Sequence, residues 1–120
     1  MSKMILLSLI INIAVLVPVC SSILMEANWV QDAYGPPGPG RGILLAIYLA
    51  ILLASVFLLF GGDPKFVAAL LVIQIVYKLT TPLTVGTFKN PVVVSNLLIA
   101  VFHLATVYTI WKAGKLFTTV

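Results

Sequence analysis

Residues 66–86 read FVAALLVIQIVYKLTTPLTVG, an apolar run that holds Lys78 one turn after Gln74. The run is close to the roughly 20 residues that an α-helix needs to cross a hydrocarbon core of about 30 Å. Similar apolar segments lie at 4–25, 42–60 and 91–111. The sequence therefore predicts an all-α fold, an integral membrane four-helix bundle.

The third span, expected over 66–82, is interrupted by Pro82. From Phe66 to Thr81 a helix rising about 1.5 Å per residue would be only about 24 Å long, which is short for a full crossing. The helix either runs through Pro82 with a kink and reaches Phe88, or stops early and leaves the chain in the interface. A break inside a membrane is tolerated only where protein or water satisfies the freed backbone groups. We therefore expect a third helix that is short or kinked at Pro82.

The composition excludes a water-soluble domain. Of the 120 residues, 62% are hydrophobic and 8% are charged, whereas a soluble domain has about a quarter charged residues. This length allows a single transmembrane domain over residues 1–120. The net charge of +4 comes from basic residues near the ends of the apolar runs, which is typical of membrane anchoring and not of nucleic-acid binding. The expected partner is therefore the lipid bilayer.

Turn-forming residues separate the predicted spans. Gly61-Gly62 follows the second span, where glycine readily adopts the left-handed conformation of a helix C-terminal cap. Asp63-Pro64 has the pattern of an N-cap followed by proline at the first helical position. Asn90-Pro91 repeats this pattern before the fourth span. These signals agree with four separate helices.

The first apolar segment follows Lys3 and contains Cys20, so a signal peptide or a lipoprotein leader has to be considered. The residue before a lipidated cysteine is normally small, and Val19 is not. We therefore expect an uncleaved first helix. Four spans place both termini on one side, and the bias of basic residues favours the cytoplasm for that side. The expected location is the bacterial inner membrane.

The longest segment outside the predicted spans is EANWVQDAYGPPGPGRG, residues 26–42. Its Pro/Gly run is predicted to be non-helical. Trp29 and Tyr34 carry amphipathic rings suited to the level of the lipid headgroups. The segment is either a semi-rigid connector or a cap over the outer mouth of the bundle. We favour the connector because most links between packed elements are passive.

Small residues mark one face of the second predicted helix. Gly42, Ala46, Ala50 and Ala54 follow one another at intervals of four residues, and residues four apart share a helical face. In lipid, close backbone approach through small side chains is a usual basis of helix association. We interpret this small-residue stripe as the main packing seam, against a helix of the same chain or of a second copy.

Polar residues within the spans form two layers, and each is a site candidate because such residues are costly in a membrane. The inner layer has Asn12 and His103, each about 12 Å from the inner end of its helix at the rise of an α-helix, with Ser55 and Thr106 nearby. His and Asn side chains commonly bond neighbouring helices. We therefore expect a structural intramembrane polar network, in which Asn12 or Thr106 is the partner of His103. A proton relay through His103 is the alternative.

The outer layer comprises Lys78, Gln74, Asn96, Arg41 and Glu26. Lys78 is close enough to the interface to snorkel, burying its stem while its ammonium stays in water, and we favour this interpretation. The alternative is that these residues form a ligand-binding pocket that opens outward, with Glu26 as the counter-ion. Such a pocket suits an anionic or lipid-like ligand.

Catalytic and cofactor sites find little support in the sequence. No carboxylate lies in a predicted span, so an acid/base pair within the membrane is excluded. The sequence has no phosphate-binding glycine loop and no Ser-His-Asp set. One cysteine and one histidine leave a metal or haem without further ligands, unless two copies share a haem through His103. We expect no catalytic residue, metal or cofactor, and the sequence favours a non-enzymatic protein.

In architecture the chain resembles the DoxX-like four-helix membrane proteins. The resemblance rests on a polar first loop with Trp29 and Gly35, a second helix opened by GRG (40–42), and a third helix ending in the basic residue Lys78. Where an acid is expected in the fourth helix of such a protein, this sequence has His103. The resemblance implies the fold and no particular reaction.

Three functional hypotheses follow. The first is an accessory or assembly subunit of a larger membrane system, with a membrane-protein partner or a second copy of the chain packed on the small-residue stripe. The alternative is a carrier or binding protein for a small anionic or lipid-like ligand in the outer pocket. The third is a redox partner with a haem at His103.

Overall fold

The computed structural model describes residues 2–116 and forms five α-helices within them. Their bounds are α1 Lys3–Leu24, α2 Asn28–Tyr34, α3 Pro39–Leu59, α4 Pro64–Val85 and α5 Pro91–Lys112. In this part of the chain, α1, α3, α4 and α5 are long and apolar enough to cross a membrane, whereas α2 is a short helix of seven residues. The protein is thus an all-α, multi-pass integral membrane protein.

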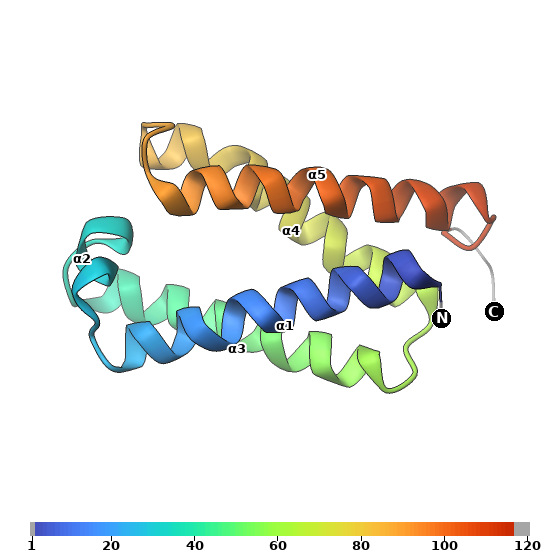
Figure 1. Ribbon diagram of the computed structural model, residues 1–120, viewed down its shortest axis with the longest axis horizontal. Coiled ribbons are helices and arrows are strands. Elements are labelled where there is room, and N and C mark those ends of the chain that lie inside the picture. The colour runs from blue at the N-terminus through green and yellow to red at the C-terminus, as the bar shows by residue number, and fades with distance from the viewer. Residues whose placement is uncertain (1, 117–120) are drawn as a thin grey trace.

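The four long helices form two pairs, α1 with α3 and α4 with α5, which contact each other less extensively than the helices within each pair. Figure 1 shows that the start of α1, the link between α3 and α4, and the end of α5 lie at one end of the bundle, which we name the terminal end. The short helix α2 and the link between α4 and α5 lie at the opposite end, the loop end. Both ends of the described chain therefore lie at the same end of the bundle.

Helix starts follow the predicted caps. The Asp63 side chain accepts a hydrogen bond from the backbone N–H of Lys65 at 2.9 Å, and Pro64 opens α4. The Asn90 side chain accepts one from the backbone N–H of Val92 at 2.8 Å before α5. Each cap satisfies an amide that would otherwise lack a partner at the helix start.

The prediction of a short third helix is wrong, because α4 continues through Pro82 to Val85. Proline cannot donate to the carbonyl four residues earlier, which belongs to Lys78. The Thr81 hydroxyl donates to that carbonyl at 2.7 Å and replaces the lost bond. The helix ends at Gly86, whose φ of 86° is the left-handed conformation that glycine adopts without strain.

The Pro/Gly run is also partly helical, contrary to the sequence prediction. Helix α3 begins at Pro39, so Gly40, Arg41 and Gly42 lie in its first turn. Proline is favoured at the start of a helix because its N–H would be unpaired there and its φ is already helical. The run therefore ends the preceding loop and starts α3.

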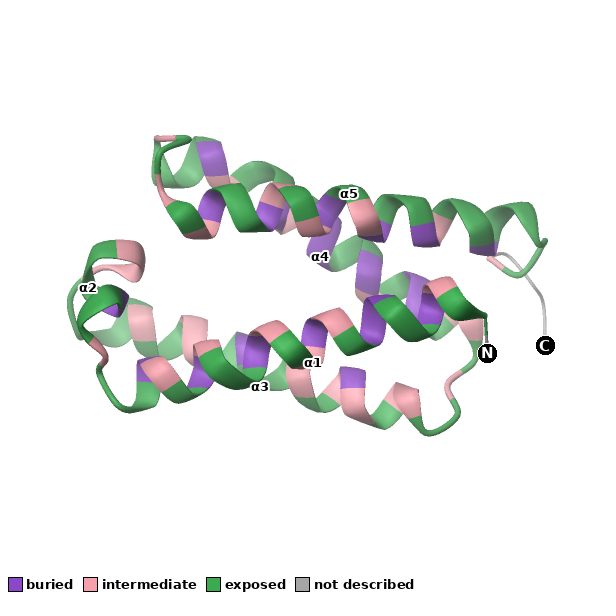
Figure 2. Ribbon diagram, in the orientation of Figure 1, coloured by how far each residue is buried: buried purple, intermediate pink, exposed green. Residues whose placement is uncertain are grey.

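Figure 2 shows buried positions on all four long helices. They include two apolar clusters and several buried polar residues. The cluster towards the terminal end comprises Ile5, Leu9, Val67, Ala68, Leu71 and Ile110. The cluster towards the loop end comprises Leu16, Cys20, Ile23, Val30, Tyr48 and Ile51. Most other apolar side chains are exposed on the outside of the bundle, as expected where lipid replaces water as the solvent.

Candidate functional site

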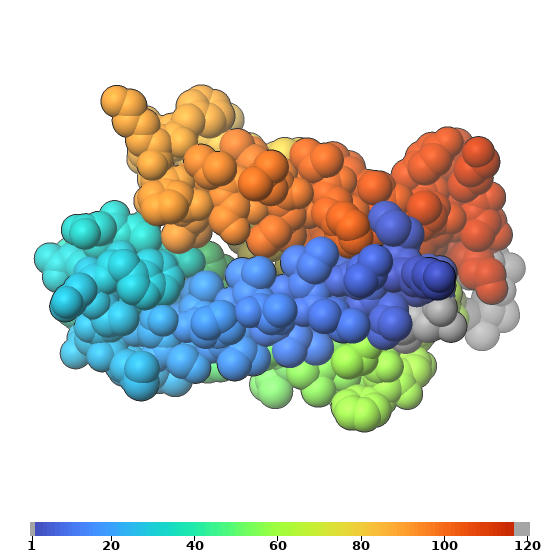
Figure 3. Space-filling view, viewed as in Figure 1, coloured from blue at the N-terminus to red at the C-terminus, as the bar shows by residue number. Residues whose placement is uncertain are grey.

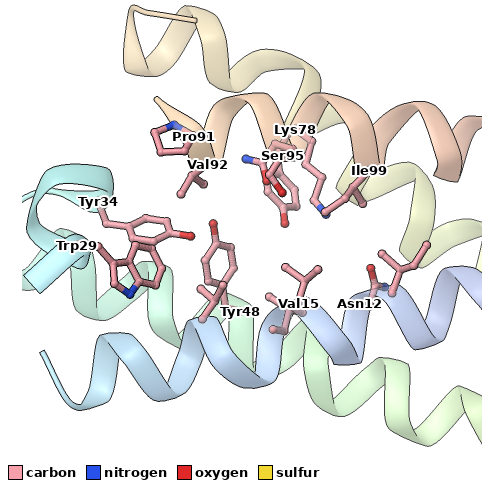
Figure 4. Close-up of a pocket in the computed structure, with 15 residues that line it drawn as sticks. Asn12, Val15, Trp29, Tyr34, Tyr48, Lys78, Pro91, Val92, Ser95 and Ile99 are labelled. Carbon is pink, nitrogen blue, oxygen red and sulfur yellow. The ribbon is translucent and has the colours of Figure 1, made fainter. Parts of the chain in front are cut away.

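A cavity of about 170 Å³ lies between the two helix pairs, towards the loop end. Figure 4 shows side chains from both pairs and from α2 pointing into it. Its walls are apolar side chains of α1 and α5, and its aromatic lining is Trp29, Tyr34, Tyr48 and Tyr77. Its polar lining is Asn12, Lys78, Ser95 and Asn96. We name this space the central cavity.

Lys78 is buried, with 6% of its surface exposed, and its side chain points into the central cavity (Figure 4). Its Nζ lies 5.8 Å from the centroid of the Tyr77 ring, a distance at which the ring face attracts a cation. Within residues 2–116, Arg41 forms an ion pair with Glu26. Lys78 has no carboxylate partner in this part of the chain. A buried cation without a counter-ion is costly, so the central cavity favours an anion beside Lys78.

Helix α2 covers the loop end of the cavity. The Trp29 and Tyr34 rings pack together with centroids 5.9 Å apart, and Tyr34 meets Tyr48 of α3 edge-on at 6.0 Å. The Asn90 side chain donates to the Ala33 carbonyl at 2.9 Å and holds α2 against the start of α5. The 26–42 segment thus does more than connect two spans, because its helix closes one end of the cavity.

Tyr34 contributes a neutral hydroxyl to the loop end of the cavity. Burial raises the pKa of Tyr34, so this hydroxyl stays neutral at physiological pH. A neutral hydroxyl both donates and accepts hydrogen bonds. The loop end of the cavity is therefore amphipathic, with apolar ring faces and hydroxyl groups.

Asn12 belongs to the central cavity, although the sequence places it in the inner polar layer. Its Nδ2 donates to Ser55 Oγ at 3.1 Å, and Ser55 Oγ donates to the Ile51 carbonyl at 2.8 Å. Asn12 Oδ1 is buried without a hydrogen-bond partner among the described residues. In Figure 4 this oxygen lies on the side of Asn12 that faces Lys78.

A fully buried polar layer continues from the cavity towards the terminal end. Ser8 Oγ and Thr106 Oγ1 lie 2.7 Å apart and join α1 to α5. Gln74 and His103 are each 0% exposed, and among the described residues their side-chain nitrogen and oxygen atoms have no hydrogen-bond partner. The bonds expected from His103 to Asn12 or Thr106 are therefore not formed in this structure.

The five residues of the predicted outer pocket separate into two groups. Lys78 and Asn96 line the central cavity, and Gln74 lies in the buried layer below it. Arg41 instead pairs with Glu26 at 3.1 Å and also donates to the Gly35 carbonyl at 3.2 Å. Glu26 is therefore the counter-ion of Arg41 and not of Lys78.

The small-residue stripe lies outside the α1–α3 contact. Gly42, Ala46 and Ala50 are exposed, and Ala54 is half-buried. The buried residues of α3 are Tyr48, Ile51 and Ser55. The stripe therefore faces the surroundings of this chain.

Comparisons with protein-family models, curated proteins and solved structures give no match to this chain. The resemblance to DoxX-like proteins gains no support beyond the four long apolar helices. Function has to be argued from the site itself.

Proposed function

We propose that the protein binds or carries an acidic amphipathic molecule in the central cavity. The observation that carries this proposal is Lys78, a buried cation that faces the cavity without a carboxylate partner in residues 2–116. An anionic headgroup would supply the missing counter-charge. Ionisable side chains inside a membrane commonly mark such sites.

The shape and lining of the cavity support an amphipathic ligand over a small inorganic anion. Most of the lining is apolar, and it includes four aromatic side chains, two of which belong to α2 at the loop end. Pockets for organic ligands combine such apolar walls with a few convergent polar groups. The acid would lie beside Lys78, and the apolar body would lie between α1 and α5.

Binding can be measured with the fluorescent acid 11-(dansylamino)undecanoate on protein in lipid nanodiscs. A Trp111→Phe background leaves Trp29, at the cavity, as the single tryptophan donor. Energy transfer to the dansyl group then reports occupancy. Decanoate is expected to displace the probe, whereas decanol and decylamine are not, because they lack the negative charge.

The decisive variant is Lys78→Met, which keeps an unbranched side chain and removes the charge. It is expected to abolish energy transfer and retain the thermal unfolding midpoint. The matched control is Lys89→Met, which removes an exposed lysine at the loop end and is expected to bind normally. Full binding by Lys78→Met would reject the proposal and leave Lys78 as an anchoring residue.

The second candidate function is that of an accessory subunit, favoured by the outward-facing small-residue stripe on α3. A helix of a partner or of a second copy can approach such a stripe closely. Ala50→Leu is expected to disrupt this association, measured as a change in migration in mild detergent. Unchanged migration and unchanged co-purifying proteins would reject this function.

We further propose that the terminal end faces the cytoplasm. Lys3, Lys65 and Lys112 lie at the helix ends that gather there, and basic residues favour the cytoplasmic side. A cysteine at position 2 in a Cys20→Ser background is expected to resist a membrane-impermeant thiol reagent in intact cells. Rapid labelling of that cysteine would reverse the orientation.

A further inference from the structure

We infer that Asn12 selects acids whose headgroup also carries a hydrogen-bond donor, such as a hydroxyl next to the carboxylate. The inference rests on the proposed binding function and adds the chemical class of the ligand. It is carried by the hydrogen bonds between Asn12, Ser55 and Ile51, and not by the charge of Lys78.

The hydrogen bonds determine which way the Asn12 amide faces. Ser55 Oγ has a single proton and uses it on the Ile51 carbonyl, 2.8 Å away. Ser55 Oγ therefore accepts at its contact with Asn12, and the donor at 3.1 Å has to be Asn12 Nδ2. If the amide turned over, Ser55 would have to move its proton from the Ile51 carbonyl to Asn12 Oδ1, so only the present orientation keeps both hydrogen bonds.

In this orientation Asn12 Oδ1 is an acceptor at the polar end of the cavity. The Asn12 side chain is 2% exposed, and this oxygen has no partner within residues 2–116. Figure 4 shows Asn12 and Lys78 at the same end of the cavity. A headgroup at this end therefore meets donors on Lys78 and an acceptor on Asn12.

A simple carboxylate provides a partner for Lys78 but not for Asn12 Oδ1. Its oxygens accept from Lys78, but an ionised carboxylate has no proton to donate to Asn12 Oδ1. A buried acceptor without a partner is costly, and filling it with a hydroxyl donor is worth about a 10-fold gain in affinity. A 2-hydroxy acid offers both groups and is the chemical class that the site fits.

The test compares decanoate with 2-hydroxydecanoate as competitors of 11-(dansylamino)undecanoate, using the Trp111→Phe protein in nanodiscs. The two competitors differ by one hydroxyl. The hydroxy acid is expected to displace the probe at about 10-fold lower concentration. Protein-free nanodiscs correct for partitioning of both acids into lipid.

Two variants assign the preference to the amide. Asn12→Leu removes the acceptor and is expected to bind the two acids equally. Ser55→Ala keeps Asn12 but removes the hydroxyl that fixes its orientation, so the amide can turn and present Nδ2 to the ligand. It is expected to lose the preference for the hydroxy acid while binding decanoate at least as well, which a change in folding would not produce.

The outcomes separate this inference from the proposed function. Equal displacement by both acids on the starting protein overturns the role of Asn12 and leaves the binding of acids at Lys78 intact. A preference that persists in both Asn12→Leu and Ser55→Ala also overturns it. If the probe does not bind to the protein, or if neither acid displaces it, the binding function is rejected and the inference with it.

Discussion

Asn90 joins two separate parts of the loop end, because its side chain caps α5 and also donates to the Ala33 carbonyl of α2 at 2.9 Å. The cap uses the oxygen of the amide, and the contact with α2 uses the nitrogen. One side chain therefore determines both where α5 begins and where α2 lies. Since Trp29 and Tyr34 of α2 line the central cavity, this hydrogen bond links the start of α5 to the loop end of the cavity.

Replacing Asn90 with Asp separates these two roles. Aspartate keeps the oxygen that accepts from the Val92 N–H but has no proton to donate to the Ala33 carbonyl. We expect little change in the unfolding midpoint and a clear increase in the quenching of Trp29 by acrylamide, measured in the Trp111→Phe background. Asn90→Ala loses both interactions and should also destabilise the protein by about 1 kcal/mol. Unchanged Trp29 quenching in Asn90→Asp would show that the Ala33 contact does not hold α2.

Thr81 explains why proline does not end α4. Thr81→Val removes the hydroxyl that bonds the Lys78 carbonyl, which Pro82 leaves without its usual partner. We expect a loss of about 1 kcal/mol in the free energy of unfolding, measured in mild detergent.

Thr80→Val is the matched control for this effect. The Thr80 hydroxyl donates to the Tyr77 carbonyl at 2.8 Å, which also has the backbone N–H four residues later as a helical partner. This variant should be close to neutral. Equal destabilisation by both variants would contradict the role assigned to Thr81.

We predict that the buried amide of Gln74 lowers the free energy of unfolding of the protein. Its side chain is fully buried, and neither end of its amide has a partner within the described chain. Gln74→Leu removes these unpaired groups with a side chain of similar length, and we expect the protein to be stabilised by about 1 kcal/mol. The measurement is thermal unfolding in nanodiscs, with Ile73→Leu on the exposed face as control. A clear loss of stability would mean that Gln74 makes bonds that this structure does not contain.

The positions of the spans could be predicted because each depends on local features of the sequence. Apolar length gives the helices, and the Asp63-Pro64 and Asn90-Pro91 caps give their starts. The length of α4 could not be predicted from Pro82 alone. It depends on a hydroxyl one residue away that replaces a lost backbone bond.

The site was harder to predict because it depends on how the helix pairs meet. Depth counted along the helices places Lys78 and Asn96 in one layer, and both residues line the cavity. It separates Asn12 from them, although Asn12 lies at the same cavity. The aromatic lining comes from three different elements, of which two are long helices, and has no signal in the spacing of the sequence.

The small-residue stripe shows a second limit of sequence patterns. Residues four apart do share a face of α3, but small side chains are acceptable both in a helix contact and towards lipid. Within this chain α3 packs through Tyr48, Ile51 and Ser55. The pattern identifies a face and does not identify what covers it.

The most direct test of the account is the chemical accessibility of position 78. Lys78→Cys, in a Cys20→Ser background, should react with a small anionic methanethiosulfonate reagent from the loop side. In the same background, Ile99→Cys also lines the cavity but keeps Lys78, so decanoate should slow the reaction of that cysteine. Val76→Cys, on the exposed face of α4, should stay unreactive because lipid excludes a charged reagent. If position 78 is as unreactive as position 76, or if decanoate does not protect Ile99→Cys, Lys78 does not face a ligand-binding cavity.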